Sequence, residues 1–135
     1  MSNTHWDPAR YGLFGNERQR PAIDLIARLP KAADGFSPRH IVDLGCGPGN
    51  VTALLAAAYP GTATDDVKIV GVDSSDEMID TAQKRDENID WQKGDIASWE
   101  PEEKVDLLFS NAALHWVPDH SKLFPRLLSF VRPGG

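Results

Sequence analysis

The sequence predicts an α/β fold in which helices flank a parallel sheet. Three observations support this prediction. Short apolar segments that suit buried strands alternate along the chain with amphipathic segments that suit helices. A turn rich in glycine, over residues 45–49, joins the first expected strand to the helix that follows it. The chain has 135 residues, which is enough for one domain or a large part of one.

The expected elements follow from apolar periodicity and from turn residues. The first helix begins near Pro21, since proline suits the first helical position. Asn50 is expected to cap the second helix, while Ser74 and Glu77 form a capping-box pattern for the third. Pro125 predicts a kink or a late start in the last helix. In order, we expect a helix at 21–29, a strand at 40–44, a helix at 51–59, a strand at 68–72, a helix at 74–85, strands at 89–93 and 105–109, and a helix around 123–128.

Composition and charge indicate a soluble globular protein. Hydrophobic residues make up 41% of the chain and charged residues 25%, which argues against a disordered or membrane-spanning chain. The net charge of −6 argues against nucleic acid as the main partner, because phosphate binding usually needs a basic face. The first residues lack the pattern of a signal peptide, and the single cysteine, Cys46, can form neither an intrachain disulfide nor a zinc-ligand pair. We therefore expect a cytoplasmic protein without a metal centre.

The strand, glycine-rich turn and helix over residues 40–59 form an arrangement that binds nucleotides. Gly45, Gly47 and Gly49 allow a tight turn and a close approach of the ligand to the backbone. The next helix points its free N–H groups toward the ligand. Asp73 ends the second strand, roughly two dozen residues further on, where it can accept hydrogen bonds from ribose hydroxyls.

The glycine spacing and the acidic residue before it distinguish between ligands. The glycines follow a G-x-G-x-G pattern, whereas the dinucleotide fingerprint is G-x-G-x-x-G. Asp43 begins the motif, and its carboxylate is unfavourable beside a pyrophosphate but favourable beside an ammonium and a sulfonium group. The pattern therefore favours S-adenosylmethionine over NAD, and an NAD-dependent oxidoreductase is the less favoured alternative.

Several segments, in order, resemble the class I S-adenosylmethionine-dependent methyltransferases. The resemblance covers about residues 39–135 and rests on residues 43–49, 71–75, 94–96, 106–111 and 132–135. It implies a Rossmann-like fold in which the loop backbone contacts the methionine part and Asp73 binds the ribose. It also implies that Asp95 and Ile96 flank the adenine and that Asn111 lies by the sulfonium. The implied cofactor-binding residues are Asp43, Gly45, Cys46, Gly47, Gly49, Asp73, Ser74, Met78, Asp95, Ile96 and Asn111.

Residues 6–11, 17–21, 94–99 and 111–120 resemble the trans-aconitate methyltransferase family more closely. That family methylates a carboxylate of a small tricarboxylic acid, so the resemblance implies a small-molecule carboxylate substrate. A carboxylate is ionised near neutral pH and needs no general base, so catalysis can come mostly from alignment of the reactants. Arginine forks suit carboxylates, and the candidate substrate-binding residues are Arg10, Arg18 and Arg20. The candidate catalytic residues are His115 and Trp116 after the fourth strand, and Tyr11 in an N-terminal lid.

Each assignment has a structural alternative. The glycine turn can be simply a tight turn, Asp73 a helix cap and Met78 a core residue. Cys46 is better explained as a small residue in a crowded loop than as a nucleophile, because no partner base is evident. The three arginines can be solvated charges, and His115 and Trp116 can pack against the last helix.

The predicted organisation is an N-terminal helical cap or lid over residues 1–38, followed by the first half of a Rossmann-like domain over residues 39–135. The sequence supplies four strands and stops before a fifth, so the fourth strand would have an exposed apolar edge that favours self-association. Two functions of different classes stay open: part of a small-molecule methyltransferase, and a non-catalytic cofactor-binding or interaction module. We expect the 135-residue chain to bind the cofactor weakly and to turn over poorly.

Overall fold

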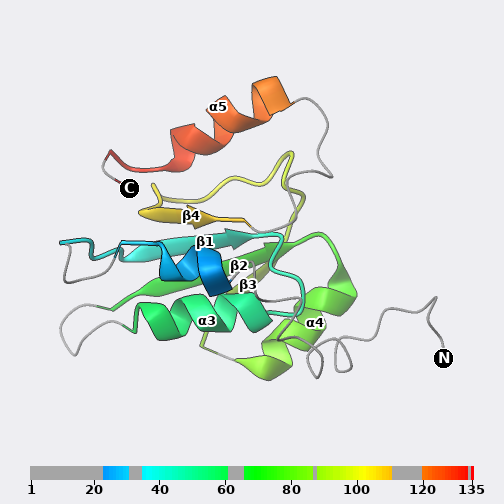
Figure 1. Cartoon of the computed structure of the whole chain (residues 1–135). Helices are drawn as coiled ribbons and strands as arrows, with labels where there is room; N and C mark the ends of the chain where they lie inside the picture. Colours follow the sequence, from blue (N-terminus) through cyan, green and yellow to red (C-terminus); the bar gives the residue numbers. More distant parts are fainter. Residues whose placement is uncertain (1–22, 31–34, 61–65, 87, 111–119, 134) are drawn as a thin grey trace.

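The computed structural model describes residues 23–30, 35–60, 66–86, 88–110, 120–133 and 135. Within them, four parallel strands form one sheet in the order β3-β2-β1-β4 (Figure 1). The strands are β1 (His40–Leu44), β2 (Lys68–Asp73), β3 (Asp90–Lys93) and β4 (Leu107–Phe109). All five residues of β1 are buried, because this strand lies between β2 and β4. The predicted parallel sheet is confirmed.

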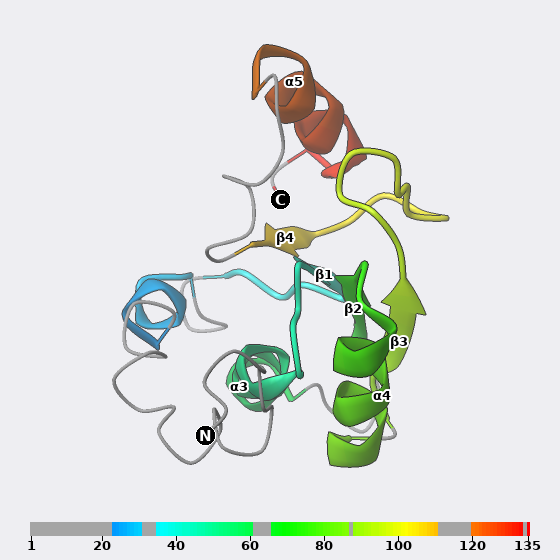
Figure 2. The ribbon, with the colours of Figure 1, turned by 90° about the vertical axis from the view of Figure 1, so that its right-hand side faces the viewer.

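Helices cover both faces of the sheet (Figures 1 and 2). They are α3 (Asn50–Ala58), α4 (Asp76–Arg85) and α5 (His120–Phe130). α3 and α4 lie on one face and α5 lies on the other. Successive residues of β1 point into separate cores: Ile41 belongs to the core that includes Leu55 of α3, and Val42 to the core that includes Leu123 of α5. Burial on both faces explains the apolar runs of β2 and β4, over residues 69–72 and 107–109, whereas the edge strand β3 is largely polar.

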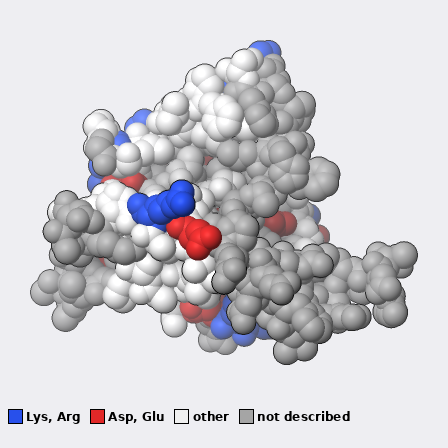
Figure 3. Space-filling model, in the orientation of Figure 1, with Lys and Arg blue, Asp and Glu red and all other residues white. Residues whose placement is uncertain are grey.

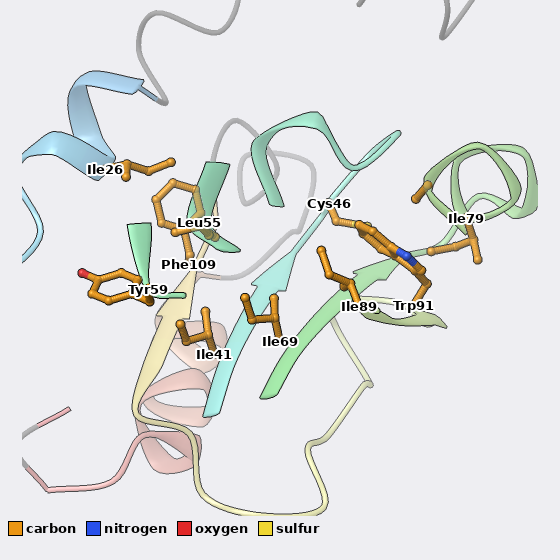
Figure 4. Close-up of a cluster of buried hydrophobic side chains, with 11 residues drawn as sticks. Ile26, Ile41, Cys46, Leu55, Tyr59, Ile69, Ile79, Ile89, Trp91 and Phe109 are labelled. Atoms are coloured by element: carbon orange, nitrogen blue, oxygen red, sulfur yellow. The ribbon is translucent and has the colours of Figure 1, made fainter. Parts of the chain in front are cut away.

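A further helical segment spans residues 23–27, inside the helix predicted at 21–29. Ile26 is 8% exposed and belongs to the same core as Leu55. The hydroxyl of Tyr59, the residue after α3, donates to the carbonyl oxygen of Pro30 at 2.6 Å. These contacts attach the segment to the α3 side of the sheet, as the view in Figure 4 shows for Ile26 and Tyr59.

Two predicted helix caps are wrong. α3 begins after Gly49, which occupies the N-cap position with φ of 89°, so Asn50 is the first helical residue and not the cap. α4 is capped by Ser75, whose hydroxyl accepts an amide hydrogen bond from the first turn, and not by Ser74. The backbone amide of Ser75 donates to the carboxylate of Asp73 at 2.9 Å. This hydrogen bond extends the turn after β2 and moves the start of α4 by one residue.

The fourth strand is shorter than predicted, because Val105 leaves the ladder with β1. Val105 forms a parallel bridge with Val131, and its carbonyl oxygen accepts the backbone amide of Arg132 at 2.8 Å. The chain after α5 therefore returns beside the start of β4. α5 begins at His120 and includes Pro125, so the predicted late start is wrong.

The described surface carries charges of both signs. On the face shown in Figure 3, the coloured side chains form small groups, and a basic group adjoins an acidic one. The sequence has 14 Lys and Arg residues against 20 Asp and Glu residues. Across the described ranges, no helix is both long and apolar enough to cross a membrane.

Candidate cofactor-binding site

The glycine loop lies at the edge of the sheet where β1 and β2 end, the edge that faces the viewer in Figure 2. The backbone amides of Gly45 and Cys46 both donate to the carbonyl oxygen of Val72, at 2.7 and 2.9 Å. These bonds fix the loop to the end of β2. Gly45, Gly47 and Gly49 have φ values of 78°, 57° and 89°, in the left-handed region that favours glycine. The loop conformation therefore depends on all three glycines.

Trp91 of β3 packs against the glycine loop, a contact that the sequence interpretation missed. Its side chain is 8% exposed and lies beside Cys46 (Figure 4). The indole Nε1 donates to the carbonyl oxygen of Asp86 at 2.7 Å. A Cβ atom would lie 2.7 Å from the indole at Gly49 and 2.4 Å from it at Gly71. Both glycines therefore make room for the indole ring. In the sequence, a large aromatic residue on a strand next to a strand that contains glycine would have indicated this contact.

Asp73 connects three segments at this edge. Its Oδ2 accepts the backbone amide of Gly47 at 3.0 Å, and its Oδ1 accepts the backbone amide of Ser75 at 2.9 Å. Its main-chain carbonyl oxygen accepts the amide of Gly94 at 3.0 Å, which brings the loop after β3 to the same edge. A carboxylate has about four acceptor sites. Asp73 is partly exposed, so it keeps acceptor capacity for a ligand hydroxyl.

Asp43 is a buried carboxyl group on the α3 side of β1. Asp43 is 2% exposed, and its Oδ2 accepts a hydrogen bond from Oγ1 of Thr52, a residue of α3 with 0% exposure, at 2.7 Å. Burial raises the pKa of Asp43 from 3.8 to about 7, while the hydrogen bond from Thr52 lowers it and the charge of Asp73 raises it. Near neutral pH the carboxyl group is therefore partly protonated, and a cationic ligand group would favour its ionised form.

The first turn of α3 carries a buried amide donor for which the described residues supply no acceptor. Gly49 offers no side chain to cap the first turn, and that turn contains no acidic residue. This donor is Nδ2 of Asn50, a residue that is 9% exposed, and it has no hydrogen-bond partner within the part of the chain that the structure describes. A buried amide without an acceptor is unfavourable and calls for an explanation. A ligand oxygen beside the loop would supply the missing acceptor.

Cys46 has the features of a packing residue. Its Sγ donates to the carbonyl oxygen of Gly47 at 3.5 Å, and burial, followed by the charges of Asp43 and Asp73, raises the pKa of the thiol. A thiol with a raised pKa is a poor nucleophile. Within the described ranges, no group of three or more His, Cys, Asp or Glu residues could hold a metal ion.

The other predicted cofactor residues are partly described. Asp95 is exposed, and its Oδ1 accepts the backbone amide of Ala97 at 2.9 Å. Ile96 is partly buried and packs against the core on the α5 side. Ser74 is exposed and Met78 is half-buried. The predicted site residues that lie outside the described residues are Arg10, Tyr11, Arg18, Arg20, Asn111, His115 and Trp116.

A family model described as a methyltransferase domain matches residues 41–135. The matched span contains the glycine loop, both carboxyl groups and nearly the whole sheet. The chain belongs to the methyltransferase domain family. Because Asp43 and Asp73 both fall inside the match, the site described above is part of this methyltransferase domain.

Two curated relatives named trans-aconitate 2-methyltransferase are similar to this methyltransferase domain. The relative from Methylobacterium nodulans is 48% identical over 130 residues, which cover 96% of this chain and 47% of the relative. The relative from Methylobacterium radiotolerans is 45% identical over 130 residues, which cover 96% of this chain and 46% of the relative. The chain thus spans about half the length of the curated relatives it matches.

A solved structure also shares the fold. The structure of an S-adenosylmethionine dependent methyltransferase from Mesorhizobium loti has a TM-score of 0.67 and 28% sequence identity. The match covers 87% of this chain and 50% of that chain. Together with the strand order, this likeness confirms the predicted Rossmann-like class I methyltransferase fold, of which the described residues form one part.

Proposed function

We propose that the protein is an S-adenosylmethionine-dependent methyltransferase that methylates a carboxylate of a small polycarboxylic acid such as trans-aconitate. The observation that carries this proposal is the pair of carboxyl groups at the glycine loop. Thr52 binds the buried Asp43, and Gly47 binds the partly exposed Asp73. The names of the two curated relatives support the substrate class. We also propose that the protein is cytoplasmic, and the single cysteine, which is free and buried, supports this location.

The polar groups of the site fit each part of the proposed cofactor. Asp43 is a buried carboxyl group whose ionised form matches an ammonium group, and Asn50 has a buried donor that matches a carboxylate oxygen. Asp73 has acceptor capacity for ribose hydroxyls. We propose that Asp95 and Ile96, together with Met78, Ser74 and the loop residues Gly45, Cys46, Gly47 and Gly49, complete the cofactor side of the site. Asn111 belongs to the same proposal.

The chemistry of the proposed reaction asks little of the protein's own acids and bases. When bound, the cofactor supplies a methyl group on a positively charged sulfur. A substrate carboxylate is already ionised near neutral pH, so the protein needs no general base and acts by holding the reactants in line. Cationic and hydrogen-bonding side chains must hold the rest of the substrate, and residues 1–38 are proposed as a cap. The residues proposed for the substrate side are Arg10, Tyr11, Arg18, Arg20, His115 and Trp116.

Calorimetric titration of the 135-residue chain with S-adenosylmethionine, and separately with NAD, tests the cofactor. We expect weak binding of S-adenosylmethionine and none of NAD. Asp43→Asn removes a charged acceptor, so it should weaken S-adenosylmethionine binding by roughly tenfold or more. Equal affinity for both ligands would contradict the proposed cofactor. For the substrate, the protein is incubated with S-adenosylmethionine and trans-aconitate, and mass spectrometry should detect a methyl ester. The absence of a methyl ester with trans-aconitate and with related acids would contradict the substrate class.

A further inference from the structure

Resting on the proposed function, we infer that Thr52 is a positioning residue that favours the ionised form of Asp43 for the ammonium group of the cofactor, whose binding then depends on pH. Thr52 lies outside the glycine loop, in the first turn of α3. It was not among the residues that the sequence pattern indicated. Its hydroxyl connects α3 to β1 through a side chain that takes no other part in the proposed chemistry.

The geometry gives the Thr52 hydroxyl a well-defined partner. Its Oγ1 lies 2.7 Å from Oδ2 of Asp43, which is the usual distance of a well-formed hydroxyl–carboxyl hydrogen bond. Thr52 is 0% exposed and Asp43 is 2% exposed, so water does not compete freely for this bond. A hydrogen bond to a charged acceptor is stronger than one between neutral groups. The contact therefore favours the ionised form of Asp43.

Among the described residues, the groups that act on Asp43 are few. Burial disfavours its ionised form, and so does the charge of Asp73 from the end of β2. The thiol of Cys46, on the loop, stays neutral because its pKa is raised. Thr52 is the one described contact that lowers the pKa of Asp43, which burial raises to about 7. An ammonium group would act in the same direction as Thr52, so binding should release a proton when Asp43 is protonated in the empty site.

The test compares Thr52→Val, which removes the hydroxyl at nearly constant shape, with Thr52→Ser, which keeps it. Calorimetry of the 135-residue chain measures S-adenosylmethionine affinity from about pH 5.5 to about 7.5, in buffers with different ionisation enthalpies. We expect the affinity of the unaltered chain to rise with pH and a proton to be released on binding. Thr52→Val should bind roughly tenfold to a hundredfold more weakly near pH 6.5, with its midpoint at higher pH. Thr52→Ser should follow the unaltered chain.

Several results would overturn the inference. A purely structural role for Thr52 predicts that both variants lose affinity by the same factor at every pH. Binding by the unaltered chain without proton release overturns the inference without any variant, so it stays testable if Thr52→Val fails to fold. If S-adenosylmethionine does not bind at any pH, the proposed function fails instead. In that case carbon-13 NMR titration of Asp43 in the empty chain still tests Thr52, because the midpoints of Thr52→Ser and Thr52→Val should differ.

Discussion

The half of the molecule built on β1 and β2 and the half built on β4 and α5 use their polar side chains differently. In the β1–β2 half, Asp43 and Asp73 accept a buried hydroxyl and two backbone amides at the edge where the strands end. In the β4–α5 half, the strand has three residues, and Phe124 and Leu128 of the helix are 45% and 70% exposed. Among the described residues, the two carboxyl groups at the glycine loop therefore belong to the β1–β2 half, while α5 mainly covers one face of the sheet.

The two halves also differ in how their side chains pack, and the glycine loop depends on a close contact with Trp91 of β3. β3 lies next to β2, and its Trp91 fills the space beside Gly49 and Gly71, where it contacts the glycine loop. By contrast, α5 uses Leu123 and Leu127, 4% and 6% exposed, to cover its face of the sheet. Its Arg126 donates to the main-chain carbonyl oxygen of Ile96 at 2.9 Å. A change in the packing under the loop should therefore affect both stability and binding, whereas a change on the outer side of α5 should affect neither.

The largest expected effect follows from this packing. Trp91→Ala should lower the free energy of unfolding by about 3–5 kcal/mol, because it leaves a cavity under the loop. Leu128→Ala is the matched change in the β4–α5 half. Leu128 is 70% exposed, so its removal should change the free energy of unfolding by less than about 0.5 kcal/mol. Urea unfolding of the two variants measures both values. Equal losses in the two variants would mean that the packing under the loop is no more important for stability than the outer side of α5.

A second prediction concerns the pH dependence of stability. The pKa of Asp43 is about 7 in the folded chain against an ordinary 3.8, so the folded state holds this proton more tightly than the unfolded state. The stabilisation of the folded state by this proton is complete below about pH 4 and is lost as pH rises to about 7. The loss amounts to at most roughly 4 kcal/mol. Asp43→Asn cannot ionise, so its stability should stay level over this range in urea unfolding.

The control for this prediction comes from the other half. Asp106 accepts the backbone amides of Arg39 and His40 and pairs with Arg132 at the opposite edge of the sheet. Asp106→Asn should therefore lower stability overall and leave the decline between about pH 4 and about pH 7 in place. If the decline persists in Asp43→Asn and vanishes in Asp106→Asn, the titrating group has been assigned to the wrong half.

The sequence predicted the sheet and the glycine loop because both depend on local patterns. Apolar runs give buried strands, and glycine spacing gives the turn. It placed the cap of α4 at Ser74 because the capping-box spacing fits there, but the amide of Ser75 is bound by Asp73, and the cap moves to Ser75. It extended the fourth strand to Val105 because the residue is apolar, but Val105 pairs with Val131. A local hydrogen bond within the turn after β2 decided the first case, and pairing between segments far apart in sequence decided the second.

Sequence positions indicated the two carboxyl groups of the candidate site but not the side chains that pack against Asp43 and the loop. Asp43 and Asp73 could be recognised from their positions at the ends of strands. The roles of Thr52 and Trp91 depend on which residues face each other across α3, β1 and β3, and no local spacing specifies that. Asn50 was assigned to the helix cap from its residue type. In the structure its amide is buried and finds no acceptor among the described residues, which becomes evident only when the surrounding atoms are placed.

A substitution of Asn50 that has little expected effect on stability separates binding from folding. Asn50→Leu replaces a buried, unpaired amide by an apolar group of similar size, so the free energy of unfolding should change by less than about 1 kcal/mol or increase. In the β4–α5 half, Ser110→Ala removes a hydroxyl that donates to the carbonyl oxygen of Leu44 at 2.9 Å. That change should cost about 1 kcal/mol, because it leaves an acceptor without its donor.

The effects of these substitutions on cofactor affinity should rank differently from their effects on stability. If the amide of Asn50 binds a ligand oxygen, Asn50→Leu should weaken S-adenosylmethionine binding by roughly tenfold while the chain remains as stable as before. Calorimetry for affinity and urea unfolding for stability, performed on the same preparations, measure the two quantities. Unchanged affinity in Asn50→Leu would mean that the unpaired amide is a packing defect of α3 and has no part in the site. Weaker binding at unchanged stability would mean that Nδ2 of Asn50 donates to an oxygen of the ligand. The unfavourable buried amide at the N-terminus of α3 would then be explained by its role in binding.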